Sequence, residues 1–149
     1  MAGPANVWKA ECKPGDDWPA GVRGERLLDR SAGPRLVSAV WELDPGAASP
    51  HYHLHHATEE LFVVLDGEAT LRTPSGERPV ERGDVVHFPT GAAGAHQVVN
   101  RSADVVRYLM VAAHGAMDAV EYVDEARVLV SSHRKSLVQD GTLFFSHDA

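Results

Sequence analysis

The sequence lacks the features that direct a protein to the cell surface or into a membrane. Cys12 is the only cysteine, so no disulfide can form within the chain, as is usual in a reducing compartment. No apolar run approaches the roughly 20 residues that cross a bilayer. Pro4, Asn6 and Glu11 interrupt the start of the chain, where a signal peptide would need an apolar stretch. We therefore expect a cytoplasmic protein with no membrane partner.

Positive charge is also scarce. The chain has 14 Lys and Arg against 21 Asp and Glu, which gives a net charge of −7 at pH 7. Such a charge repels the phosphate backbone of nucleic acids. The longest basic cluster, His133-Arg134-Lys135, has no interleaved aromatic residues, and neither end of the chain shows a helix-turn-helix pattern. We expect no nucleic-acid partner.

Long amphipathic helices are missing from the first 113 residues, where Gly and Pro divide the sequence into short segments. Alternating or continuous apolar residues between turn sequences instead predict an all-β protein of about eight strands. Only Met117–Val128 could form a helix, although its three valines weigh against one. The expected strands cover 36–43, a segment starting near His51, 61–65, 69–72, 77–80, 85–88, 98–99 and 105–112.

The length of 149 residues suits one domain, residues 1–149. Within it we expect an N-terminal flank (1–35), a barrel core (36–112) and a C-terminal extension (113–149). The two flanks lack a regular pattern and hold apolar residues that one small core would leave uncovered. Exposed apolar residues of this kind favour a homodimer; they are Trp8, Trp18, Leu143, Phe144 and Phe145.

Four of the nine histidines lie in one short segment, which reads His51-Tyr52-His53-Leu54-His55-His56 and continues with Ala57-Thr58-Glu59-Glu60. Side chains alternate between the two faces of a strand, so His51, His53 and His55 share a face, and two imidazoles at i and i+2 can bind one ion. Glu60 reaches that face only if the chain bends at 57–59. Imidazole and carboxylate ligands suit one divalent metal ion: Fe, Mn, Ni, Co or Zn.

This segment resembles the first of two cupin motifs, G-x5-H-x-H-x3,4-E-x6-G, and a later segment resembles the second, G-x5-P-x-G-x2-H-x3-N. The first falls on Gly46, His53, His55, Glu60 and Gly67, and the second on Gly83, Pro89, Gly91, His96 and Asn100. Six residues rather than five separate Gly46 from His53, and four rather than two separate Gly91 from His96. Both departures change loop lengths and leave the ligand spacings intact.

The resemblance implies a double-stranded β-helix, the cupin jelly-roll barrel, with irregular N- and C-terminal flanks. It also implies a metal inside the barrel, bound by His53, His55, Glu60 and His96. We expect Asn100 to fix a hairpin end by hydrogen bonding.

Other residues near the motifs keep more than one possible role. Glu59 replaces Glu60 if the bend differs by one residue. His51 could act as a proton shuttle, replace Glu60 as a ligand, or lie at the rim. His56 and His87 receive no role, and Arg72 and Tyr108 could reach the cavity.

Members of the cupin superfamily have many functions, so the fold alone does not select one. Open positions on the metal favour a metal-dependent enzyme, of oxygenase or isomerase type, that acts on a small oxygen-rich molecule. The alternative is a non-catalytic small-molecule binder or a metal-stabilised structural barrel. The sequence leaves the metal, the substrate and the reaction open.

Overall fold

The computed structural model describes residues 4–28, 35–115, 117–132 and 136–139. They form twelve β-strands and one short 3-10 helix, η1 (Ala92–Gly94), so the expected all-β class is confirmed. No helix in this part of the chain is long and apolar enough to cross a membrane. The basic cluster at 133–135 and the apolar residues at 143–145 lie outside the described residues.

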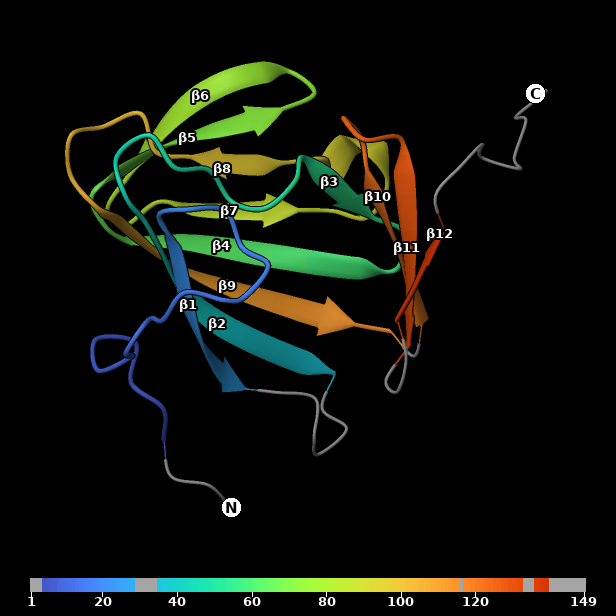
Figure 1. The fold of residues 1–149 in the computed structure, drawn as a ribbon, viewed down its shortest axis with the longest axis horizontal. Helices are drawn as coiled ribbons and strands as arrows, with labels where there is room; N and C mark the ends of the chain where they lie inside the picture. The colour runs from blue at the N-terminus through green and yellow to red at the C-terminus, as the bar shows by residue number, and fades with distance from the viewer. Residues whose placement is uncertain (1–3, 29–34, 116, 133–135, 140–149) are drawn as a thin grey trace.

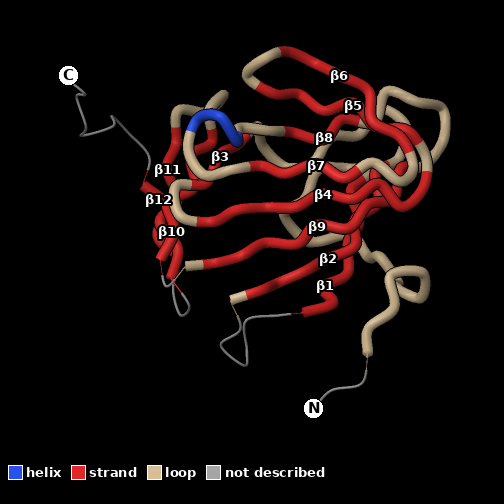
Figure 2. Tube along the Cα trace, turned by 180° about the vertical axis from the view of Figure 1, so that it is seen from behind, coloured by secondary structure: helices blue, strands red, loops and turns tan. Residues whose placement is uncertain are grey.

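The larger wall is a five-stranded antiparallel sheet with the order β1-β2-β9-β4-β7 (Figure 2). The inner face of this sheet carries both part of the apolar core and one side of the site. Their bounds are β1 Val22–Leu28, β2 Leu36–Leu43, β9 Val106–His114, β4 Thr58–Asp66 and β7 Val85–Phe88.

Two smaller sheets complete the barrel (Figure 1). One has the order β6-β5-β8, and the other has the order β12-β11-β10-β3. They meet at one backbone bridge, in which His53 N donates to His96 O (3.1 Å) and His96 N donates to His53 O (2.8 Å). The bounds are β5 Glu68–Thr73, β6 Gly76–Glu81, β8 Gln97–Val99, β3 His53–His55, β10 Met117–Tyr122, β11 Arg127–Ser132 and β12 Ser136–Gln139.

The apolar core occupies one end of the barrel and the polar site the other. On β4 every second residue points inward: Val64 and Phe62 are buried in the core, and Glu60 is the next inward residue. The β4–β9 register pairs Val64 with Tyr108 and Glu60 with Ala112. Because side chains alternate on a strand, one face changes from core to site within four residues.

Asn100 fixes a loop by hydrogen bonding, as expected, but the loop is not a hairpin end, because it leads from β8 in one sheet to β9 in another. Its side chain is fully buried and donates two hydrogen bonds, to Leu43 O (2.9 Å) and Asp104 O (2.8 Å). Its Oδ1 accepts from the backbone N–H and the hydroxyl of Ser102 (2.9 and 2.8 Å). The amide therefore ties the loop after β8 to the end of β2.

The possibility that Met117–Val128 forms a helix is wrong. This segment forms β10 and the start of β11, joined by a turn. Asp118 and Val120 are 5% and 7% exposed, whereas Met117 is 62% exposed, which is the period of a strand. Pairing with β3 on one side and β11 on the other satisfies the backbone of β10, and this overrides a weak helical preference.

The flanks are also more regular than expected. β1 lies within the predicted N-terminal flank, and β10, β11 and β12 lie within the predicted C-terminal extension. The segment before β1 is held by Arg107, which donates to Val7 O and Ala10 O at 2.8 Å each. Trp18 packs on Trp41 with ring centroids 4.6 Å apart.

Candidate metal centre

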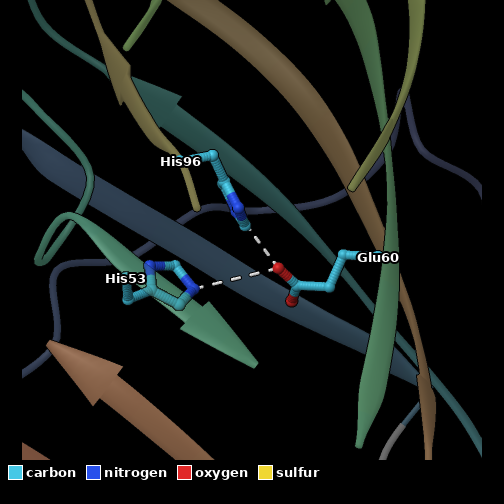
Figure 3. A group of neighbouring side chains, drawn as sticks. All are labelled: His53, Glu60 and His96. Carbon is cyan, nitrogen blue, oxygen red and sulfur yellow. Dashed lines mark ion pairs between the residues drawn. The ribbon is translucent and has the colours of Figure 1, made fainter. Parts of the chain in front are cut away.

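Three histidines converge on one carboxylate inside the barrel (Figure 3 shows His53, Glu60 and His96). His53 and His55 lie on β3 and Glu60 lies on β4. His96 lies immediately before β8. Their Nε2 atoms lie 3.8, 3.6 and 3.1 Å from Glu60 Oε2, in the order His53, His55, His96. The structure thus places the three predicted histidines around Glu60, and the group whose ligand atoms all lie within 4.8 Å of one another is His53, Glu60 and His96, without His55.

The bend required to turn Glu60 inward is present. β3 ends at His55 and β4 begins at Thr58, and the two residues between them change which face the following side chains occupy. The N–H of Ala57 donates to Asp118 Oδ1 (2.8 Å), which holds the bend in place. Glu59 consequently points outward, 3.5 Å from His87 Nε2, so it does not replace Glu60.

The Nδ1 atom of each histidine is already engaged. His53 Nδ1 contacts His51 O (3.2 Å), His96 Nδ1 contacts Gly94 O (2.8 Å), and His55 Nδ1 contacts Asp118 Oδ2 (2.5 Å). Carbonyl and carboxylate oxygens only accept, so each Nδ1 must carry the hydrogen. In a neutral ring this leaves the Nε2 lone pair directed at the centre, as in histidines that bind metal.

Burial and charge set the protonation of two of these groups. Burial, aided by the charge of His96, lowers the pKa of His53 to about 4. Burial alone would raise the pKa of Glu60, but the contact with His96 and the charges of the surrounding histidines lower it to about 2. At neutral pH a neutral imidazole therefore faces a carboxylate, which is the state that binds a metal.

The donor set fits a divalent metal ion. Although His96 Nε2 and Glu60 Oε2 lie 3.1 Å apart, neither buried atom has a hydrogen-bond partner of acceptable geometry among the described residues. Buried polar atoms without partners are costly and rare, and a metal would satisfy both of these. The ligand atoms of His53, Glu60 and His96 lie within 4.8 Å of one another, so these residues could hold an ion.

Two cavities meet at this centre. The first, of about 260 Å³, includes His51, His53 and Tyr122 in its wall. The second, of about 440 Å³, includes Arg26, His114 and Asp118. Both are lined by Trp41, His55, Glu60, Met110 and Val120. The centre is therefore open on two sides, unlike a purely structural metal site, which is closed.

The sequence comparisons agree with the fold and the motifs. The model of the family described as Cupin domain matches residues 39–112, which extend from β2 into β9. The chain belongs to the cupin superfamily. No curated protein matches this cupin.

Solved structures extend the similarity over most of the chain. A sugar phosphate isomerase of the cupin superfamily from Silicibacter pomeroyi is 25% identical, with 90% of each chain covered and a TM-score of 0.79. A candidate sugar phosphate isomerase from Acidithiobacillus ferrooxidans is 27% identical, with coverage of 93% of this cupin and 90% of that chain and a TM-score of 0.76. A Cupin 2 conserved barrel domain protein from Salinispora arenicola is 26% identical over 72% of this cupin and 91% of that chain, with a TM-score of 0.56.

His51 lines the first cavity but lies outside the ligand cluster of this cupin. It precedes β3 with a φ of 56°, a conformation uncommon for residues other than glycine. Its Nδ1 lies 2.7 Å from Glu125 Oε1, and its ring stacks on Tyr122 with centroids 4.1 Å apart. His51 therefore does not replace Glu60 as a ligand, and its place in the cavity wall is compatible with the rim position and with the proton shuttle.

The sequence left the positions of three further residues open: His56, Arg72 and Tyr108. His56 pairs with Glu121 at 3.5 Å and is half exposed. Arg72 lines neither cavity; its guanidinium pairs with Asp124 at 2.6 and 2.8 Å and lies 4.1 Å from the ring centroid of Tyr52. Tyr108 is buried and lines the first cavity.

Asp118 is the main functional residue that the sequence analysis missed. Its carboxylate orients His55 and holds the bend at Ala57. Burial alone would raise the pKa of Asp118, but hydrogen bonds from His55, Thr58 and Ala57 lower it to about 2. The signal available in the sequence was that Asp118 and the apolar Val120 share one face if 117–120 forms a strand.

Proposed function

We propose that this cupin is a metal-dependent isomerase of a small phosphorylated sugar. The observation that supports it most strongly is the convergence of three Nδ1-anchored histidines on Glu60, in a centre open to two cavities. The substrate class comes from the sugar phosphate isomerase that is 25% identical over 90% of the chain. A sugar phosphate also satisfies the expectation of a small, oxygen-rich ligand.

The four ligands of the proposed metal are His53, His55, Glu60 and His96. A divalent metal bound there would supply a Lewis acid that polarises a carbonyl or hydroxyl oxygen of the sugar. The protein anchors the three imidazoles through Nδ1 and keeps Glu60 deprotonated. These residues hold the ligand atoms in position before the substrate arrives, and this preorganisation lowers the reorganisation needed for reaction.

Isomerisation of an aldose to a ketose moves one proton from C2 to C1 and a second from the C2 hydroxyl to the carbonyl oxygen, so it also needs a group that accepts and returns a proton. We propose His51 for this role, because it lines the first cavity and Glu125 holds its Nδ1 at 2.7 Å. Stacking on Tyr122 fixes the plane of the ring. His51→Gln should therefore lower kcat of the metal-loaded protein by about 100-fold or more without reducing metal content.

The direct test is an isomerase assay on metal-loaded protein, with aldose and ketose phosphates as substrates and NMR detection of the product. Wild type and His87→Ala should turn over the same substrate, since His87 is an exposed histidine paired with Glu59. His96→Ala should lose both metal and turnover. Metal-loaded wild type that converts no sugar phosphate in such a panel would contradict the isomerase proposal.

Oxygenase chemistry and simple binding give different results in the same experiment. An iron-loaded oxygenase would consume O2 with an organic substrate. A binder would change the visible spectrum of the cobalt-loaded protein when a sugar phosphate is added, without forming product. Either result, with no isomerisation, would replace the proposed function.

A further inference from the structure

Arg26 lies on the inner face of the large sheet. On β1, Val22 is buried in the apolar core and Gly24 faces Trp41, whose ring is 3.0 Å from the position of an added Cβ. Arg26 follows at the same two-residue spacing, and it lines the second cavity. It is an exposed residue that also borders a hollow beside Lys9 and Lys13, so its side chain is accessible to a ligand in solution.

The strand register connects Arg26 to the metal centre. Arg26 pairs with Ala39 on β2, Ala39 with Met110 on β9, and Met110 with Phe62 on β4, two residues from Glu60. Three strand spacings separate β1 from β4, which is about 14 Å between backbones. Ala39 and Ala112 line the second cavity between these strands, and their short side chains leave space for a ligand.

Arg26 is the only Lys or Arg that lines either cavity in the described part of the chain. It has no ion pair with any described residue, unlike Arg23, Arg72, Arg101 and Arg107. Glu60 and Asp118 also line the second cavity, but Glu60 faces the histidines and the two oxygens of Asp118 accept hydrogen bonds from His55 and Ala57. Arg26 thus remains available for an anionic ligand.

We propose that Arg26 binds the phosphate of the substrate, with the sugar extending through the second cavity toward the metal centre. This inference rests on the proposed function and assigns an orientation to the substrate. A guanidinium forms two parallel hydrogen bonds to phosphate oxygens, so Arg suits this role better than a point charge. His114, whose Nδ1 is 3.0 Å from Thr58 Oγ1, lines the same cavity and adds a polar group to the path.

The test compares binding of D-ribose 5-phosphate and D-ribose to Arg26→Gln by calorimetry on metal-loaded protein. The matched control is Arg78→Gln, which removes an exposed arginine from β6, outside both cavities. Arg26→Gln should weaken binding of the phosphate by about 10- to 100-fold, the effect of losing hydrogen bonds to a charged group, and leave ribose binding unchanged. Arg26→Lys should recover part of the loss, because it restores the charge without the paired donors.

The outcomes separate this inference from the proposed function. Equal affinity of wild type and Arg26→Gln for D-ribose 5-phosphate would overturn the role of Arg26. The isomerase proposal would still stand if turnover of a sugar phosphate is lost in His96→Ala. Wild type that binds the phosphate no more tightly than ribose would also overturn the phosphate site. An equal loss in Arg78→Gln would reduce the effect to general surface charge and contradict the assignment.

Discussion

Asp118→Asn provides a sharp test of how the protein prepares its metal ligands. Asp118 offers two acceptors: Oδ2 to His55 Nδ1 at 2.5 Å and Oδ1 to Ala57 N at 2.8 Å. Asparagine has nearly the same shape but only one acceptor, because its other atom is an NH2 group. Either the bend at Ala57 loses its partner, or His55 must move its hydrogen from Nδ1 to Nε2.

The second rearrangement removes the Nε2 lone pair from the metal centre. Loss of a residue that orients a ligating histidine weakens metal binding by about 10- to 100-fold, which corresponds to about 1.4–2.7 kcal/mol. The unsatisfied donor or acceptor should in addition cost the apo protein about 1–3 kcal/mol of unfolding free energy. The two effects act on different measurable quantities.

Metal competition with a chromophoric chelator measures the affinity, and urea denaturation of the apo protein measures the stability. The pH dependence gives a further check. The pKa of Asp118 is about 2 in the folded protein, below the value of about 3.9 in unfolded chains. The resulting stabilisation is present above pH 4 and is lost as the pH falls toward 2, and Asp118→Asn should lack this change. A folded Asp118→Asn variant with both wild-type metal affinity and wild-type stability of the apo protein would refute the reasoning.

The remaining predictions concern the ligands, the core and the assembly. Glu60→Gln should weaken metal binding less than replacement of a histidine by Ala, because the three nitrogens remain; unchanged affinity would place Glu60 outside the ligand set. Asn100→Ala removes four hydrogen bonds at a fully buried site and should lower the unfolding free energy by about 2–4 kcal/mol in urea denaturation; a change below about 1 kcal/mol would contradict its structural role. The homodimer stays a prediction, supported by Trp8 and Val85, which are 59% and 61% exposed; light scattering that shows a monomer at micromolar concentration would count against it.

The regular part of the fold was predictable because local patterns and the observed strands coincide. The strand predicted at 36–43 is β2, and the one predicted at 85–88 is β7, each bounded by turn residues. The segment after residue 113 was less predictable, because β10 depends on pairing with β3, which is distant in the sequence. Contacts between segments distant in sequence leave a weak signal in local propensity.

The candidate site likewise has a part that the sequence predicts and a part that it does not. His53, His55, Glu60 and His96 could be identified because their motif spacings survive in the sequence, and the structure brings them together. The residues that support or extend the site lie far from the motifs in the sequence. Asp118 reaches His55 across 63 positions, and Arg26 reaches the second cavity from a segment expected to be irregular. Only the folded sheet register places them at the site.

The central claim is that the three histidines and Glu60 bind a divalent metal, and metal content of protein produced without a histidine tag tests it most directly. Wild type and His87→Ala should each contain one metal ion per chain when measured by inductively coupled plasma mass spectrometry. His53→Ala and His96→Ala should contain none, even after incubation with Fe, Mn, Ni, Co or Zn salts and removal of the excess. Stoichiometric metal in both variants, or wild type that takes up none of these ions, would contradict the account.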